Sequence, residues 1–373
     1  MSPLTALASV ALLGTRVNAD FIPTVLGTPR VLGNVSDPTI DRDSCGSDRF
    51  GDRALWTCRD SQPFSKGVPV LPIYSSSSSW TDFASDSTPL IQTWTDAAGN
   101  TETGLLCSGK NNEKPFFPYP SDECSSNTAG ACDDGTRYVL WPNSPPLVTN
   151  EDTSTGAITA YTWISEDHIN GSLTLLNPGP GTILYEIKSD PHMNGDSTGL
   201  PTVTTIQENF WTADEMPYGV YGEVVVNDVA YLYGQNAVRT VGLAKVSAGS
   251  VADKSAYQYY VDGVDGTGVS ITNAGAGGQG TFYYSTVWNL YVWIGQAGIS
   301  VAPDFYITTA PALEGPWVRP INFYSADYIN WSYTLQAHPG LLANSSENAI
   351  YLTYTINDSG YYWTPLVYVQ WES

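Results

Sequence analysis

Two aspartates, Asp43 and Asp60, flank a pair of cysteines in the segment that most favours acid–base chemistry. If Cys45 and Cys58 form a disulfide directly across an antiparallel hairpin, Gly51-Asp52 falls at a two-residue tip, where a Gly-first type II′ turn is favoured. In that register Asp43 faces Asp60, and the period-two alternation of strands puts both carboxyl groups on the face that carries the cysteines. The cysteine spacing and the turn dipeptide therefore predict the same close carboxyl pair.

Two carboxylates directly opposite each other destabilise a sheet, so this placement needs a reason. A close carboxyl pair can share one proton, with the pKa of one member raised while the other member stays ionised. That division suits the general acid and the base or nucleophile of glycoside hydrolysis. The alternative is that Asp43 and Asp60 cap turns or face solvent, or that strand twist or a bulge separates them.

Several other motifs indicate turns rather than chemistry. Gly195–Gly199 matches the G-x-S-x-G nucleophile motif, but no strand precedes it and no helix follows it. Gly275–Gly280 matches the dinucleotide fingerprint, but β-type residues follow it, which predicts a hairpin loop. His338 precedes a late strand and is either a site residue or a hydrogen-bonded structural histidine. The cysteines and histidines lack metal-ligand spacing, so neither a metal site nor a cofactor is predicted.

The elements that position these residues are short β-branched and aromatic runs bounded by Gly, Pro, Asn and Asp, with no convincing helical period. Examples are Ala54–Cys58, Ile158–Ile164, Thr182–Ile187, Glu223–Val226, Val229–Tyr233, Thr281–Ile294, Ala349–Ile356 and Pro365–Trp371. This pattern predicts one all-β domain and favours a five-bladed β-propeller, with a right-handed β-helix or jelly roll as the alternative. We expect a tight hairpin at Asn227-Asp228, and pairing of the last strand with the N-terminal segment to close the ring.

The composition limits the classes of molecule that the protein is expected to bind. The 373 residues carry 15 Lys plus Arg against 37 Asp plus Glu, a net charge of −22, which argues against nucleic acids and anionic membranes. The chain has 24 Tyr and 12 Trp but only 14% charged residues, which favours a surface that meets sugars. We expect a polysaccharide or oligosaccharide as the substrate and a monomeric protein.

The N-terminus predicts secretion. An apolar run, Leu4–Leu13, precedes a small-residue cleavage site, so residues 1–19 are expected to be a signal peptide and residues 20–373 the propeller. Five cysteines then imply two disulfides and one free thiol, with Cys45–Cys58 as the preferred pair. Residues 98–135 are expected to be a disulfide-pinned insertion. Sequons at Asn34, Asn170, Asn330, Asn344 and Asn357 indicate an extracellular glycoprotein.

The segments Arg42–Ser47 and Arg53–Ser61 resemble the R-D-G-G-x-S and G-R-x-L-W-x-F-G-D-T patterns of a family of secreted five-bladed β-propellers that includes the endo-D-arabinanases. Later pieces are similar to that family in the same order: Tyr231–Gly234, Trp288–Tyr291, Gly315–Trp317 and His338–Leu342. This chain departs from the family at Ser44-Cys45, which replaces a glycine-rich turn, and at Cys58-Arg59, which replaces Phe-Gly.

The resemblance implies a glycoside hydrolase acting on a plant, fungal or bacterial polysaccharide, of the arabinan type, through two aspartates. Asp43 and Asp60 match the catalytic positions. We expect four further residues to line an axial substrate pocket: Trp56, Glu223, Asn289 and His338. The alternatives are a polysaccharide lyase on the same propeller, with His338 or a tyrosine as the base, and a non-catalytic carbohydrate-binding protein.

Overall fold

The computed structural model describes residues 21–96, 99–109, 114–120, 123–124, 130–190, 199–260, 270–327 and 331–372. Throughout these ranges the regular elements are β-strands and three short 3₁₀ helices, η1 (Ala248–Ser250), η2 (Lys254–Ala256) and η3 (Pro339–Leu341). The all-β prediction is therefore confirmed for them. The predicted signal peptide, residues 1–19, lies outside the described residues. No helix within the described ranges has the length and apolar character to cross a membrane.

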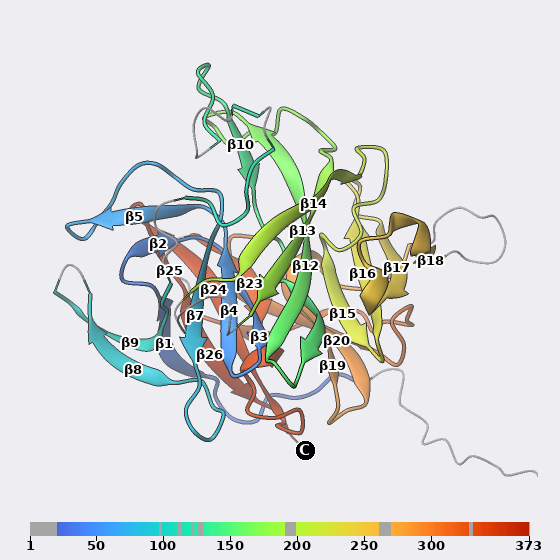
Figure 1. Ribbon diagram of the computed structural model, residues 1–373. Coiled ribbons are helices and arrows are strands. Elements are labelled where there is room, and N and C mark those ends of the chain that lie inside the picture. The colour runs from blue at the N-terminus through green and yellow to red at the C-terminus, as the bar shows by residue number, and fades with distance from the viewer. Residues whose placement is uncertain are drawn as a thin grey trace, which may run out of the picture.

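Four antiparallel sheets follow one another along the chain (Figure 1). The first consists of β3 (Gly46–Phe50), β4 (Arg53–Cys58) and β7 (Ser77–Asp82). The second consists of β10 (Arg137–Leu140), β11 (Leu147–Asp152), β12 (Ala157–Ile169), β13 (Thr182–Ser189) and β14 (Thr202–Trp211). The third consists of β15 (Gly222–Val226), β16 (Val229–Gln235), β17 (Val241–Ser247) and β18 (Gln258–Tyr259). The fourth consists of β19 (Gly277–Ser285), β20 (Leu290–Ala297), β21 (Asp304–Ala310) and β22 (Ile321–Ser325).

The fifth sheet combines both ends of the chain. Its strands are β23 (Trp331–Ala337), β24 (Ala349–Asp358), β26 (Pro365–Gln370), β1 (Arg30–Ser36), β9 (Thr101–Leu106) and β8 (Ile91–Thr95), with β25 (Tyr361–Trp363) on β24. β1 pairs with β26, with Val31 opposite Val367, which confirms the predicted pairing of the last strand with the N-terminal segment. A small sheet of β2 (Ile40–Arg42), β5 (Ser61–Ser65) and β6 (Val68–Pro69) lies outside this series.

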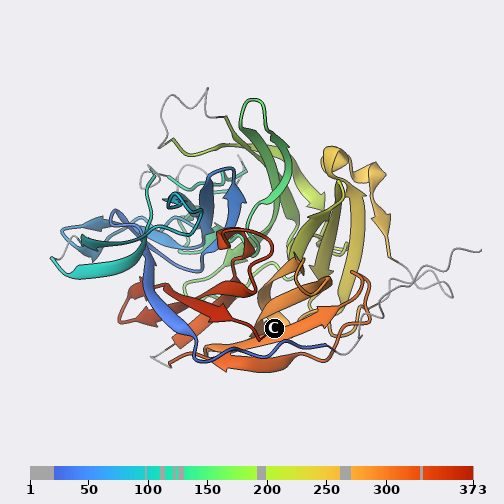
Figure 2. The same ribbon diagram turned by 90° about the horizontal axis from the view of Figure 1, so that it is seen from below.

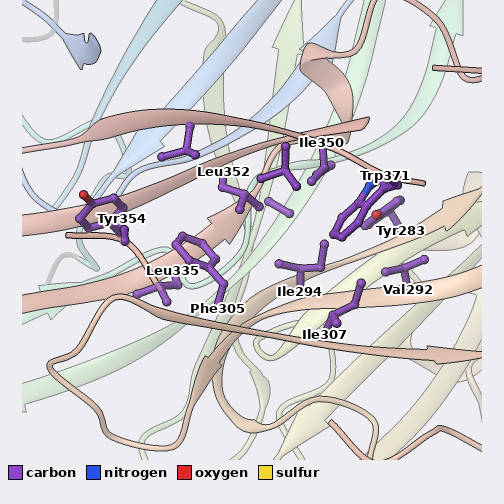
Figure 3. Packing of buried hydrophobic residues seen from close by; sticks show 14 of the residues in the cluster. Tyr283, Val292, Ile294, Phe305, Ile307, Leu335, Ile350, Leu352, Tyr354 and Trp371 are labelled. Carbon is purple, nitrogen blue, oxygen red and sulfur yellow. The ribbon is translucent and has the colours of Figure 1, made fainter. Parts of the chain in front are cut away.

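The five sheets succeed one another around the molecule in chain order (Figure 2). Each neighbouring pair is held by its own apolar cluster, because both faces of each sheet carry buried side chains. One such cluster packs β19–β21 against β23, β24 and β26 around Phe305 and Leu352 (Figure 3). The others pack the fifth sheet on the first, the first on the second, the second on the third, and the third on the fourth. Each of the five sheets is therefore packed on the next one, and the fifth is packed on the first.

Much of the aromatic content belongs to these clusters. Trp56, Trp163, Trp211 and Trp293 are all at most 1% exposed. Indole rings of this size fill the space between sheets that pack face to face. The aromatic-rich composition favours a surface that meets sugars. These four tryptophans belong to the core instead.

Two tight hairpins have the predicted form. Asn227 and Asp228 both have positive φ angles, 50° and 59°, as a type I′ turn between β15 and β16 requires. Between β3 and β4 only Gly51 is left-handed, at 62°, as expected for a type II′ turn. The apolar run Thr281–Ile294, in contrast, is two strands, because the chain reverses between Ser285 and Leu290.

The cysteine count also has the predicted outcome of two disulfides and one thiol. Cys45 is bonded to Cys58, Cys124 is bonded to Cys132, and Cys107 is free and buried. The Cys124–Cys132 disulfide lies within the expected insertion at 98–135, and the first part of that segment is a strand. It forms β9, which pairs in parallel with β1 in the fifth sheet.

The parallel pairing of β9 with β1 requires glycine where the backbones meet. A Cβ atom on Gly104 would lie 1.9 Å from the Asn34 carbonyl oxygen, and the φ of Gly104 is +144°. We expect Gly104→Ala to lower the free energy of unfolding by at least about 3 kcal/mol, because the strands must separate. Gly360→Ala, with φ +89° and no atom within 4 Å of the new Cβ, should cost only about 1 kcal/mol. Denaturant unfolding of both variants checks this; equal losses would contradict it.

Candidate active site

The first hairpin keeps the predicted register on both sides of the disulfide. Gly46 pairs with Thr57, and beyond the disulfide Arg42 of β2 pairs with Ser61 of β5. Between these pairs the hydrogen bonding is irregular: the Asp43 N–H donates to the Asp60 carbonyl at 2.8 Å, while the Asp43 carbonyl accepts from the Arg59 N–H at 2.8 Å. Asp43 therefore bonds to two successive residues of the opposite segment, and the register is restored at the next pair.

The irregular hydrogen bonding coincides with an unusual placement of neighbouring side chains. In a regular strand Arg59 and Asp60 would point to opposite faces. Here both line the same cavity as Asp43. The two predicted aspartates are thus brought together, with a guanidinium group beside them.

Asp60 is held as an ion pair. Its Oδ2 accepts a hydrogen bond from Arg137 Nη2 at 2.6 Å, and its Oδ1 accepts one from Trp141 Nε1 at 2.8 Å. The Asp60 and Arg137 side chains are only 14% and 16% exposed, so water screens this pair weakly. β10 supplies Arg137 and ends just before Trp141, so the second sheet orients the Asp60 carboxylate.

Asp43 has a different environment. Burial raises the pKa of Asp43 to about 6, and the nearby Asp60 charge adds to the rise. The Ser44 hydroxyl, the Arg59 charge and a hydrogen bond from Tyr333 act in the opposite direction on this pKa, and burial outweighs them. Near pH 6 Asp43 is therefore poised between a proton donor and a carboxylate, whereas Asp60 is tied to a cation.

A line of hydroxyl groups extends from Asp43. Ser44 Oγ donates to Asp43 Oδ1 at 2.5 Å and lies 2.7 Å from Thr334 Oγ1, and Thr334 Oγ1 donates to Gln279 Oε1 at 3.0 Å. The hydrogen bond from Ser44 favours the ionised form of Asp43, and burial outweighs it.

The cavity around the two aspartates has a volume of about 600 Å³, within the range of small-ligand sites. All five main sheets, or the loops next to them, contribute to its wall. Besides the two acids, the wall includes Arg59, Trp141, Asn143, Tyr221, Gln235, Gly277, Gly278, Gln279, Gln296, Trp331, Tyr333, Asn357 and Tyr362. Amide side chains, tyrosines and exposed indoles are the groups that bind sugar hydroxyls and sugar faces.

The four side chains expected to line the pocket lie elsewhere. Trp56 is fully buried and donates from Nε1 to Thr81 Oγ1 at 2.9 Å. Asn289 is exposed in the turn before β20, with a positive φ of 53°. Glu223 faces a separate cavity of about 60 Å³, next to Asp48. A cavity of that size holds a water molecule or two and no sugar.

His338 has a structural role. It is fully buried, with Nδ1 2.8 Å from Ser47 Oγ and Nε2 2.7 Å from Thr353 Oγ1. Burial lowers the pKa of His338 to about 3, so the ring is neutral. Its ring packs on Trp56, with the two centroids 4.8 Å apart. It thus joins β3, η3 and β24, the outcome that the structural alternative for this residue described.

Most of the site carries no sequence signal. Trp141 and Tyr333 of the wall, and Arg137 behind Asp60, are far from the aspartates in sequence and belong to no motif. Gly277 and Gly278 are the exception, since they belong to the glycine run that predicts a hairpin loop. A Cβ on Gly278 would lie 2.5 Å from the Gly298 carbonyl oxygen, so glycine is needed there to admit the neighbouring backbone.

Within the described ranges, no three His, Cys, Asp or Glu side chains gather in a way that could hold a metal ion.

Neither a protein-family model nor a curated protein matches this chain. Solved structures do. A Bacteroides ovatus chain, provisionally described as a hydrolase, matches with a TM-score of 0.55 and 13% identity over 91% of this chain and 87% of that one. At this identity the similarity shows a shared fold.

Two further solved structures are similar over part of their own length. The exo-β-1,3-galactanase of Phanerochaete chrysosporium has a TM-score of 0.48 and 12% identity, covering 91% of this chain and 64% of the galactanase. The Trypanosoma rangeli sialidase has a TM-score of 0.42 and 9% identity, covering 88% of this chain and 44% of the sialidase. This chain spans less than two thirds of either protein.

The raised pKa of Asp43 has a consequence for stability. Because the folded-state pKa, about 6, exceeds the ordinary 3.8, the folded protein binds the proton more tightly, and Asp43 costs stability as pH rises from about 4 to 6. Asp43→Asn removes this cost. We expect the unfolding free energy of the variant, relative to wild type, to improve by about 2 kcal/mol between pH 4 and pH 7.

Asp60→Asn is the matched control, because it leaves Arg137 without its carboxylate partner and should be destabilising at pH 7. Denaturant unfolding at both pH values measures the two differences. A difference between Asp43→Asn and wild type that does not change with pH would contradict the assignment of the raised pKa to Asp43.

Proposed function

We propose that this protein is a glycoside hydrolase, with Asp43 as the proton donor and Asp60 as the base or nucleophile. The observation that carries the proposal is the pair itself: two carboxyl groups line one cavity, one with a raised pKa and one paired with Arg137. In glycosidases, a carboxyl group with a raised pKa acts as the acid, and a second carboxylate in a different environment acts as its counterpart.

The chemistry follows from these assignments. Asp43 gives its proton to the leaving glycosidic oxygen as the bond to the anomeric carbon breaks. Asp60 either takes a proton from the attacking water or bonds to that carbon before water displaces it. Water supplies the new hydroxyl group in both cases. The carboxylate of Asp60 is oriented by Arg137 and Trp141, which fixes the direction of attack.

We extend the proposal to the propeller architecture, secretion, monomeric state and substrate that the sequence predicts. The five-sheet series with its five packing clusters supports a five-bladed propeller arrangement. We infer that residues 1–19 are removed as a signal peptide and that the mature chain is a secreted, monomeric glycoprotein. The two disulfides fit an oxidising compartment. An arabinan-type polysaccharide is the first substrate to test.

The lyase alternative is less well supported. It requires a base near the cavity, and His338 is buried away from it. Tyr333 does line the cavity, but burial and the adjacent Asp43 raise its pKa above the usual range, so the phenolate that would act as the base is scarce near neutral pH.

The test is a screen of the secreted protein against arabinans, arabinogalactans and uronate glycans, with new reducing ends as the readout. Asp43→Asn and Asp60→Asn should each lower kcat/KM about 10²- to 10⁴-fold on the polysaccharide that is cleaved. Asp228→Asn, in the exposed β15–β16 turn, removes a charge of the same kind far from the cavity and should leave the rate unchanged.

Three outcomes would contradict the hydrolase. Unsaturated products that absorb in the ultraviolet would indicate a lyase. Binding without turnover would indicate a carbohydrate-binding protein. Full activity in Asp43→Asn would show that Asp43 is not the proton donor.

The pH profile tests the role of Asp43 separately. Since the acid must be protonated, kcat/KM should fall above about pH 6. Ser44→Ala removes a hydrogen bond that lowers the Asp43 pKa, so its alkaline limb should move to higher pH. A limb that stays in place in Ser44→Ala would mean that another group sets it.

A further inference from the structure

A second cavity adjoins the one that contains the aspartates. It has a volume of about 310 Å³ and lies among β1, β2, β8, β9 and β25, strands that lie together at one edge of the molecule (Figure 1). Tyr362 lines both cavities. The two spaces are therefore neighbours on either side of one residue.

Contacts of Tyr362 place it between two sets of acids. Its backbone N–H donates to the Asp41 carboxylate, at 3.1 Å to Oδ1 and 3.3 Å to Oδ2. Burial first, and then the charges of Asp43, Asp60 and Asp41, raise the pKa of its phenol above the usual range, while the charge of Arg137 acts in the opposite direction. Tyr362 is thus close to the acids of both cavities.

The wall of the second cavity has the character of a sugar site. Trp94 of β8 and Trp363 of β25 line it, and Trp363 is 37% exposed, so indole surface is available to a ligand. Stacking of an apolar sugar face on an indole, with hydrogen bonds from hydroxyl groups to nearby carboxylates, is the expected mode of contact. Asp37, Asp41 and Glu102 supply carboxylates in the same wall.

The charge of this wall selects the ligand. Arg42 is the basic residue in it, but it is only 5% exposed and donates to Ser79 Oγ and to Cys107 Sγ. Its charge is therefore directed into the protein. A wall of carboxylates without an accessible cation repels uronates and other anionic sugars and accepts neutral ones.

We propose that the second cavity binds additional, uncharged sugar units of the chain that is cleaved at Asp43 and Asp60, so that one polysaccharide chain passes over Tyr362. This inference rests on the proposed function and extends it. It assigns the substrate class as a neutral polysaccharide and makes recognition depend on chain length. Trp94 and Trp363 would bind units remote from the cleaved bond.

Binding to the Asp60→Asn protein tests the inference, because that variant should cleave its ligand at least about a hundredfold more slowly than wild type. The probes are linear arabinan-derived oligosaccharides of two and six sugars, measured by calorimetry. Trp94→Ala and Trp363→Ala, each combined with Asp60→Asn, should weaken binding of the hexasaccharide at least tenfold and change binding of the disaccharide less than twofold. Thermal unfolding verifies that each variant is folded.

Trp331→Ala is the matched control, since this exposed indole lines the cavity of the aspartates. It should weaken binding of both lengths. A galacturonate hexasaccharide should bind at least tenfold more weakly than the neutral one. The inference is overturned if Trp94→Ala and Trp363→Ala do not distinguish the two lengths, if the galacturonate binds as tightly, or if neither length binds.

The same experiment separates the two proposals. If the length-dependent losses occur but the wild-type protein cleaves no glycan, the hydrolase proposal fails and the second binding site stands. If the wild-type protein cleaves arabinan while both tryptophan variants bind the two lengths equally well, the hydrolase stands and the second site fails.

Discussion

The site depends on the register of one hairpin. A disulfide and a type II′ turn fix the pairing of β3 with β4, so the residues that follow on either side must meet at Asp43 and Asp60. A fully regular ladder would send Arg59 to the opposite face from Asp60. The irregular hydrogen bonding at Asp43 instead presents Arg59 and both acids to one cavity, and the register is restored where Arg42 pairs with Ser61. Two carboxyl groups that would otherwise repel each other are thus accompanied by a cation.

The difference between the two acids is supplied by distant parts of the chain. Arg137 and Trp141, next to the second sheet, bind Asp60, while Tyr333 and Thr334 from β23 approach Asp43 and Ser44. Neither acid is special by itself. The packing of sheets around the molecule brings a cation to one and a buried, hydroxyl-lined environment to the other, and the electrostatic asymmetry results from that packing.

Local sequence signals predicted the features that depend on local geometry. The hairpin register, the turns at Gly51 and Asn227, the all-β class and the closing strand all follow from side-chain period, turn chemistry and cysteine spacing. The surroundings of the two acids could not be predicted in this way, because Arg137 and Tyr333 reach Asp60 and Asp43 only through contacts far along the chain. His338 and Trp56 show the converse: residue types typical of sugar sites are used here as core.

The pairing of β1 with β26 also determines when the protein acquires its site. Arg30 meets Tyr368 only after nearly the whole chain has been synthesised, and contacts this distant in sequence form late and slowly. Until then both aspartates exist without Tyr333, Thr334 and Tyr362 around them. A nascent or truncated chain therefore carries the acids but not their environment.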